Sequence, residues 1–343
     1  LSSHVPMVLE VLDRVGRLDA AEGYLGVWTR RLRPLAPRTD PELDAYPAAL
    51  ERARSRVDRL GPFEALADAM PDLASGLLGA AFHGLIRVSH AARAIGRDDT
   101  PERREELARS LAYAEVRASA SPVAYVRPSS GGAPRTFSEE LARVMASPGA
   151  VSPRKGLITP DLEARLGGGD LLRAACETLE ISGDPRVAEG DLRRAALSLY
   201  LGTSHDPSAD FVLLHGVTAV DAVAALVPFA GPATPHLLSA MATALTALRI
   251  AYVPDVRPVA YVPERLHLWD TQTPFARVPL AVEAPSATYL LPRSLPCDVV
   301  SLTHAAGISD TGDAELNGFL PFPERFDVPD RTVQAIERTK ARG

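Results

Sequence analysis

The sequence predicts a mainly α-helical protein, a single multi-helix globular domain over residues 1–343 with long proline-rich loops. Apolar residues recur at helical spacing over most of the chain, and runs of alternating Val, Ile and Tyr are nearly absent. With 46% apolar and 23% charged residues, the chain can bury a substantial core. This composition excludes a disordered chain or a collagen-like fibre, and no internal repeat of fixed period is present.

The predicted helices lie between recognisable start and stop signals. The first covers 3–15, after a serine that can cap it, and the second covers about 19–34. A short helix follows the break at Gly61 and Pro62, and a long helix is expected over 71–95 because a proline opens it and a glycine closes it. Further helices are predicted over 101–117, 137–146, 170–180, 190–201, 208–227 and 235–252.

Two stretches, 118–156 and 254–296, are predicted to be loop-rich insertions. The first is rich in Ser, Ala, Pro and Gly, and the second carries prolines at a density that excludes helix interiors. The second stretch also concentrates aromatic residues of the kind that bind flat ligands, so we expect it to border a pocket. A homodimer contact is the alternative role. The aromatic residues are Tyr252, Tyr261, Trp269 and Phe275.

Charge and cysteine usage exclude several classes of partner. Lys and Arg number 37 against 43 Asp and Glu, so the basic surface that non-specific nucleic-acid binding requires is missing. Cys176 and Cys297 form no C-x-x-C pair and no disulfide framework, which suits a reducing compartment. Polar residues interrupt the apolar runs 211–231 and 237–253, which argues against a membrane span. We therefore expect a cytoplasmic protein without nucleic-acid or membrane partners.

Three histidines are predicted to point inward from three different helices. His4 shares an apolar face with Val8 and Val11, His83 lies in a segment of small and apolar residues, and His215 is flanked by apolar residues on both sides. Burying an imidazole costs free energy unless its nitrogens find partners. Facing helices of a bundle build metal sites from such histidines. The alternative is a core with separately hydrogen-bonded histidines.

His83, Arg87 and His90 share one stripe of their predicted helix. A solvated face would carry Glu, Lys or Gln as well, and this stripe carries none of them. We expect the stripe to face an internal cavity. The alternative is a core helix with two hydrogen-bonded histidines.

The motifs around these histidines resemble those of the questin oxidase-like family. The resemblance rests on S-H-V-P-M-V-L-E-V-L, A-F-H-G-L-I-R-V-S-H-A and F-V-L-L-H-G-V-T-A, and it spans residues 1 to about 310. It implies an oxygenase of secondary metabolism that opens or oxidises the quinoid ring of an aromatic polyketide with O2. Family enzymes are described both as Baeyer–Villiger-type catalysts and as non-haem iron oxygenases. Carried over by motif, the resemblance makes His4, His83 and His215 candidate ligands of Fe(II).

The chain departs from the family pattern near its C-terminus. The family resembles D-x-H-x-x-K-x-T-[DE]-A, whereas residues 297–306 read C-D-V-V-S-L-T-H-A-A. Asp298 then takes the place of the family histidine, Ser301 that of the lysine, and His304 that of the acidic residue. Asp298 can ligate iron, and His304 can take this role instead. The missing lysine equally fits a site that has lost its metal.

Three functions remain open at this point. The first is an iron-dependent oxygenase in which Arg87 and His90 orient a phenolate or shuttle protons. The second is a metal-free polyketide cyclase or isomerase that uses His90 or His304 for acid–base chemistry. The third is a non-catalytic polyketide-binding protein. All three take an aromatic polyketide as the small-molecule partner.

Overall fold

The computed structural model describes residues 5–14, 41–118, 124–129, 135–153, 156–202 and 207–255, with Leu18, Ala21, Glu22 and Leu25. Helices make up 81% of the described part, far above the roughly 30–35% of an ordinary domain, which confirms the mainly α prediction. The chain divides into two compact units, 39–258 and the combination of 1–38 with 259–343. Most of the second unit lies outside the described residues, so the prediction of one domain over the whole chain stays a prediction.

In the second unit the structure describes helix α1 (Val5–Arg14), which matches the helix predicted over 3–15. Its apolar residues recur every three or four positions, as in an amphipathic helix. Met7, Val8, Val11 and Leu12 are buried.

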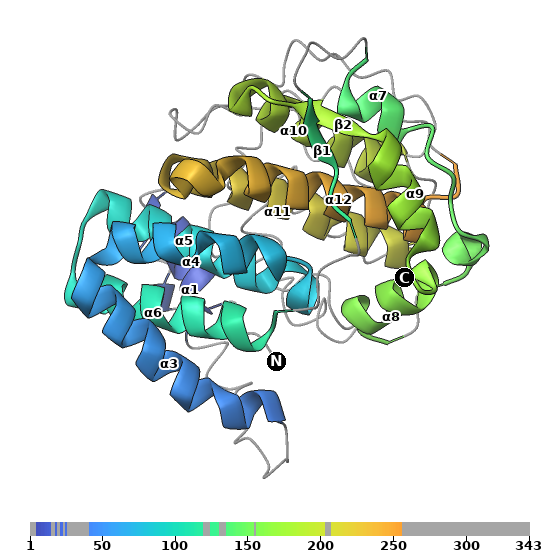
Figure 1. Cartoon of the computed structure of the whole chain (residues 1–343). Helices are drawn as coiled ribbons and strands as arrows, with labels where there is room; N and C mark the ends of the chain where they lie inside the picture. The colour runs from blue at the N-terminus through green and yellow to red at the C-terminus, as the bar shows by residue number, and fades with distance from the viewer. Residues whose placement is uncertain are drawn as a thin grey trace. The chain divides into compact units, whose positions relative to one another are not determined.

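The first half of the larger unit packs helices α3, α4 and α5 around α6. The elements of this half are α3 (Pro41–Leu60), α4 (Pro62–Ser75), the short 3₁₀ helix η2 (Gly79–Phe82), α5 (His83–Arg97) and α6 (Pro101–Val116). Helices α3 and α5 both pack on α6 (Figure 1). At the α5–α6 contact, a Cβ atom on Gly84 would lie 3.0 Å from the Cα of Ala114, so the two backbones approach closely only because residue 84 is glycine.

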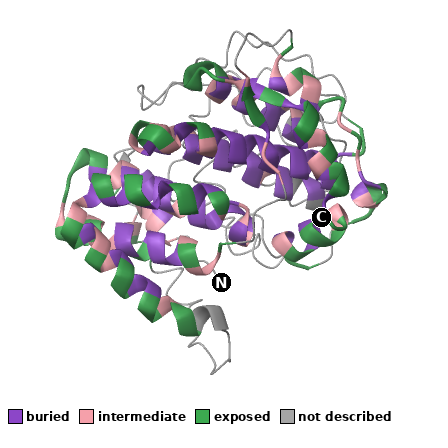
Figure 2. Ribbon diagram, viewed as in Figure 1, coloured by how far each residue is buried: buried purple, intermediate pink, exposed green. Residues whose placement is uncertain are grey.

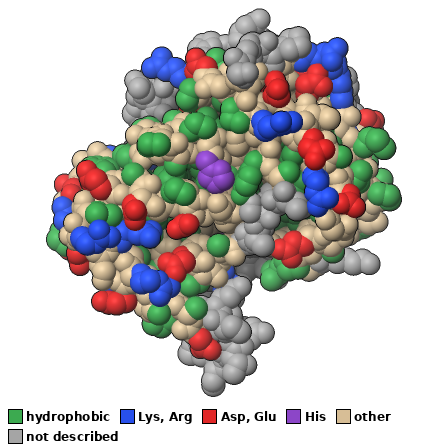
Figure 3. Space-filling view, in the orientation of Figure 1, with side chains coloured by type: hydrophobic (Ala, Val, Ile, Leu, Met, Phe, Trp, Pro, Cys, Tyr) green, Lys and Arg blue, Asp and Glu red, His purple; other side chains and the backbone are tan. Residues whose placement is uncertain are grey.

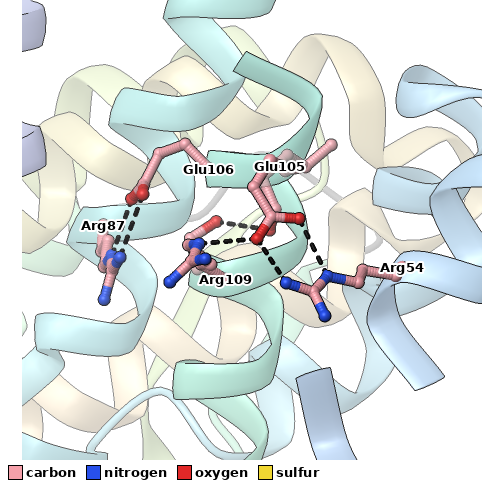
Figure 4. A network of polar contacts seen from close by, with 7 residues as sticks. Arg54, Arg87, Glu105, Glu106 and Arg109 are labelled. Carbon is pink, nitrogen blue, oxygen red and sulfur yellow. Dashed lines mark hydrogen bonds and ion pairs between the residues drawn. The ribbon is translucent and has the colours of Figure 1, made fainter. Parts of the chain in front are cut away.

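Ion pairs join α6 to both neighbours (Figure 4). Arg54 of α3 donates to both carboxylate oxygens of Glu105, at 2.9 and 2.7 Å. Arg87 of α5 donates to both oxygens of Glu106, at 2.8 and 3.1 Å. Because Glu105 and Glu106 are consecutive on a helix, they point to different sides and reach different partner helices. Two-pronged pairs of this kind are the geometrically specific form of the Arg–carboxylate contact.

The second half is built around α12, which is buried along nearly its whole length (Figure 2). Helices α10 and α11 pack against it, and Gly216 of α11 allows a close approach because a Cβ there would meet Leu248 at 2.9 Å. Two short parallel strands pair Arg127 with Glu180 and Ser129 with Ser182. The elements are β1 (Arg127–Ser129), α7 (Phe137–Leu141), η3 (Pro148–Val151), α8 (Ile158–Leu166), α9 (Asp170–Thr178), β2 (Glu180–Ser182), α10 (Pro185–Gly202), α11 (Pro207–Ala230), η4 (Gly231–Ala233) and α12 (Thr234–Tyr252).

The helical run Val212–Tyr252 is long and apolar enough, by length and composition, to cross a membrane. Of its apolar window, 67% is buried inside the protein. A core helix of a soluble protein meets the same criteria.

Most predicted helices of the larger unit are present within a few residues. Those predicted over 101–117, 170–180, 208–227 and 235–252 correspond to α6, α9, α11 and α12, and α10 begins five residues before the predicted 190. The helix predicted over 137–146 ends at Leu141. Helices α3 and α8 and both strands were not predicted. The helix predicted over 19–34 lies outside the described residues apart from Ala21, Glu22 and Leu25.

The prediction of a single long helix over 71–95 is wrong. Helix α4 runs through Pro71 to Ser75, the chain then turns, and α5 begins only at His83. The apolar periodicity continues across the break because Leu73, Leu77 and Leu85 are all buried on their separate elements. Burial rather than one continuous helix therefore explains the pattern.

The predicted insertion 118–156 contains β1, α7 and η3 within its described parts. Asp191 of α10 caps the start of α7, since its carboxylate accepts the backbone N–H groups of Phe137 and Ser138. The predicted insertion 254–296 lies outside the described residues from 256 onward.

A buried arginine closes the C-terminal end of α12. Arg165 of α8 donates to the Asp161 carboxylate at 2.6 Å and to the backbone carbonyls of Gly149, Ser152 and Ala251 at 2.7, 2.9 and 3.3 Å. Its guanidinium lies over the Tyr252 ring, 4.7 Å from the centroid. The negative end of the α12 dipole favours a cation at this position.

The two partners of Arg165 also contact each other. The Tyr252 hydroxyl donates to Asp161 at 2.9 Å, and the Tyr252 side chain is 2% exposed. Tyr252, predicted to offer aromatic surface beside a pocket, instead belongs to this interior network.

We expect the thiol of Cys176 to be unreactive in the folded protein. Burial raises its pKa to about 11, so roughly one thiol in a thousand is ionised at pH 8. In a Cys297→Ser variant, where Cys176 is the remaining cysteine, Ellman's reagent should label the folded chain very slowly. Labelling should be immediate in 6 M guanidinium. Fast labelling of the native variant would contradict this burial.

Candidate functional site

Two of the three histidines predicted to converge lie against each other. His83 begins α5 and His215 lies in α11, and their ring centroids are 5.2 Å apart with the ring planes inclined at 63°. The side chains are 4% and 0% exposed, respectively. Residues far apart in the sequence thus form one buried imidazole pair, which we call the histidine pair.

The ring of His83 is held in one orientation by the backbone. Its Nδ1 atom lies 2.5 Å from the carbonyl oxygen of Ala80. A carbonyl oxygen can only accept, so Nδ1 carries the proton and donates it. The other nitrogen, Nε2, then keeps its lone pair, which is the form that binds a metal or accepts a proton.

The carbonyl that orients His83 belongs to a strained turn. Ala80, Ala81 and Phe82 have φ values of 48°, 55° and 67°, and they are the only non-glycine residues with positive φ in the described part of the chain. A left-handed conformation costs roughly 1–2 kcal/mol for each such residue. Such strain persists only where surrounding contacts enforce it, and it concentrates at functional sites.

Packing and a hydrogen bond hold this left-handed turn in place. The Phe82 side chain is 1% exposed, and the Ala81 N–H donates to the Thr159 hydroxyl of α8 at 3.2 Å. The turn therefore depends on contacts from elsewhere in the unit.

Replacing Ala80 with glycine should stabilise the protein by about 0.5–1 kcal/mol, because glycine adopts positive φ without a Cβ penalty. Ala94→Gly is the matched control, since Ala94 has similar exposure but lies in the right-handed helix α5. The control should lose about 1 kcal/mol. Urea unfolding of both variants measures the difference. An equal loss of unfolding free energy in Ala80→Gly and Ala94→Gly would contradict the left-handed conformation of Ala80.

Arg87 and His90 continue the stripe that begins at His83. Arg87 is bound to Glu106 of α6 through two hydrogen bonds and lies 5.7 Å from the Tyr113 ring centroid. Its guanidinium is therefore engaged on the α6 side of α5. His90 is buried at 3% exposure. Their roles toward a substrate stay predictions.

An ion pair that was not predicted joins the two helices of the histidine pair. Arg93 of α5 donates to the Asp221 carboxylate of α11 at 2.6 Å and to the Asp221 carbonyl at 3.1 Å. The side chains are 12% and 9% exposed. A nearly buried pair of this geometry fixes how α5 lies along α11. The sequence feature that could have indicated this ion pair is Asp221, a charged residue at the start of the apolar segment D-A-V-A-A-L.

The remaining predicted site residues, His4, Asp298, Ser301 and His304, lie outside the described residues, as do Tyr261, Trp269 and Phe275. Within the described part of the chain, no group of three or more His, Cys, Asp or Glu side chains is placed to hold a metal ion. The histidine pair by itself contains two such side chains, one fewer than such a group.

The distance between the ring centres of the histidine pair lies within the range for two ligands of one ion. A metal–nitrogen bond of about 2.1 Å places the metal about 3.2 Å from the ring centre. Two such rings at bond angles of roughly 90–110° have centres about 4.5–5.2 Å apart. The observed separation of 5.2 Å lies at the upper end of this range.

A cleft of about 610 Å³ lies among α3, α4, α5 and α6. From α5 it is lined by Gly84 and Leu85, not by His83 or His90. The predicted stripe thus does not line this cleft. The cleft was missed because α3, which forms one wall, was not predicted.

The structure also joins a serine and a histidine that the sequence did not single out. Ser75 Oγ lies 3.2 Å from Nε2 of His236, and Tyr125 packs edge-on against the imidazole with ring centroids 5.0 Å apart. Ser75 Oγ donates to the Pro71 carbonyl at 2.9 Å, so its proton is not held by the histidine. Ser75 lies in the last turn of α4, where the helix dipole opposes an oxyanion.

This serine–histidine contact is therefore structural. On the face shown in Figure 3, acidic and basic side chains lie over α3, α5 and α6 and also on the opposite side of the view.

Three comparisons with known proteins found no relative of this chain. No protein-family model, no curated protein and no solved structure matches this chain. The resemblance to the questin oxidase-like family rests on the quoted motifs alone and stays a prediction.

Proposed function

We propose that the protein is an iron-dependent oxygenase that oxidises or opens the ring of an aromatic polyketide. The observation that carries the proposal is the histidine pair, two buried imidazoles with ring centres 5.2 Å apart on neighbouring helices. Family resemblance supports the same two residues as ligands. Neutral imidazole is the usual protein ligand for iron.

In this proposal His83 and His215 hold Fe(II). The sequence motifs alone add His4 and either Asp298 or His304 as further ligands, and these three residues lie outside the described part of the chain. Bound iron supplies the activation of O2. The Ala80 carbonyl keeps Nδ1 of His83 protonated and so directs Nε2 to the ion. Burial of both rings excludes bulk water from the pair. His90 accepts or returns the proton of a phenolic hydroxyl on the substrate.

A metal-free polyketide cyclase or isomerase is the second candidate, and one observation favours it. With Nδ1 of His83 donating to Ala80, the lone pair on Nε2 is that of a general base without any metal. A polyketide-binding protein is the third candidate.

Oxygen dependence separates these candidates. A trihydroxyanthraquinone is offered to the full chain in air and under strict anaerobiosis, with iron present or removed by chelation. The oxygenase proposal predicts O2 consumption that needs iron and that is abolished by Asp298→Ala or by His304→Ala, whichever residue is the ligand. Conversion that survives chelation without O2, and that falls in His83→Ala, His90→Ala or His304→Ala, would establish the cyclase or isomerase. Binding without conversion would establish the carrier.

A further inference from the structure

The cleft among α3, α4, α5 and α6 is a site separate from the histidine pair. Its volume of about 610 Å³ lies within the range of small-molecule sites. His83, His90 and His215 are absent from its described lining. An inference drawn from this cleft therefore does not depend on the chemistry proposed for the histidines.

By the floor of the cleft we mean its glycine, alanine and leucine residues, and this floor is apolar. The described lining contains no aromatic and no β-branched residue. Leu73 of α4, Leu85 of α5 and Leu111 of α6 contribute the larger side chains. Such a surface accepts a compact apolar body without specific polar contacts.

One wall of the cleft is a row of arginines. Arg52, Arg56 and Arg59 of α3 have the spacing that places side chains on one face of a helix, and the row extends about 10 Å along it. Arg52 pairs with Glu115, and Arg56 pairs with Asp68 at 3.1 Å.

These arginines are available to a ligand. Arg52, Glu115 and Asp68 are half-exposed or more, and such pairs contribute little stability and exchange partners readily. Arg59 is exposed and has no ion-pair partner among the described residues. The end of the row at Arg59 thus offers a guanidinium that no ion pair engages within the described part of the chain.

The charges of the cleft are separated along its length. Helices α3 and α4 run antiparallel on either side of Gly61, as the Arg56–Asp68 pair shows. Arg59 lies beside this corner. Two acidic residues line the cleft without an ion pair in the described part of the chain, namely Glu51 and Asp72. They lie about 12–15 Å from the corner along their helices. Among the residues that line the cleft, the positive end is therefore the end at Arg59.

We propose that this cleft binds an amphiphilic organic anion, a molecule with a compact apolar body and one carboxylate, sulfonate or phosphate group. The anionic group lies at Arg56 and Arg59, and the apolar body lies on the glycine, alanine and leucine floor. Guanidinium groups suit such oxygen anions. Gly79 and Gly84 of the lining flank the left-handed turn, so the ligand contacts the segment that leads to His83.

Two fluorescent probes test the predicted chemistry. 1-Anilinonaphthalene-8-sulfonate carries the anionic group, and N-phenyl-1-naphthylamine has the same rings without it. Both should bind the full chain saturably at one site. Arg59→Ala should weaken the sulfonate about five-fold and leave the neutral probe unchanged. Absence of saturable sulfonate binding, or equal weakening of both probes, would overturn the proposal.

A pair of tryptophan variants tests the location. Ser55 and Asp58 are both exposed on α3, but only Ser55 lines the cleft. Ser55→Trp should fill the cleft and weaken both probes about ten-fold or more, whereas Asp58→Trp should change neither. Circular dichroism and urea unfolding verify that both variants fold. Equal behaviour of the two variants would place the probes elsewhere and overturn the assignment.

Discussion

Arg165→Ala is expected to lower the free energy of unfolding by about 3–5 kcal/mol. The variant leaves the Asp161 carboxylate buried without its cation and leaves the carbonyls of Gly149, Ser152 and Ala251 without their donor. Asp161 and Ala251 are buried, and a buried charge or carbonyl left without a partner is among the most destabilising changes in a protein. Urea or thermal unfolding measures the loss.

A second arginine serves as the matched control. Arg173 of α9 also pairs with an aspartate in its own helix, but both partners are exposed. Arg173→Ala should change stability by less than about 0.5 kcal/mol. The double variant Arg165→Met with Asp161→Asn should recover part of the loss, because it removes both charges together. An Arg165→Ala variant as stable as Arg173→Ala would show that Arg165 does not support the end of α12.

Helices whose start signals and apolar spacing are local could be predicted from the sequence. Helix α6 begins after Thr100, whose side chain accepts the Arg103 N–H, and both the cap and the apolar spacing are legible in the sequence. The break between α4 and α5 was not predictable in this way. It is made by Ala80, Ala81 and Phe82 in left-handed conformations, and these residue types carry no turn signal. Tertiary contacts, including the bond to Thr159, decide the local conformation there.

The candidate site could be predicted only in part. The apolar surroundings of His83 and His215 indicated two inward imidazoles, and the structure places them together. The orientation of His83 was not predictable, because it depends on the Ala80 carbonyl within the unexpected turn. The Arg93–Asp221 pair depends on how α5 lies against α11, which no local pattern encodes.

His83→Ala and His215→Ala are each expected to lower the affinity for Fe(II) by more than about 100-fold. Each variant removes a proposed ligand outright, and even supporting residues around a metal typically contribute 10–100-fold. His236→Ala is the matched control, since its partners are Ser75 and Tyr125 and not the histidine pair. It should keep the affinity of the unaltered chain.

Metal-dependent thermal stabilisation distinguishes lost binding from lost folding. A metal that binds the folded state raises the melting temperature of the unaltered chain and of His236→Ala. The two pair variants should melt cooperatively but without this rise. A normal rise in His83→Ala would contradict the assignment of the pair as ligands.

The most direct measurement is the iron content of protein purified without chelator, determined by inductively coupled plasma mass spectrometry. The proposed function predicts close to one iron per chain, retained in His236→Ala and lost in His83→Ala and His215→Ala. Iron-free protein that remains active, or equal iron in all four proteins, would contradict a metal site at the histidine pair.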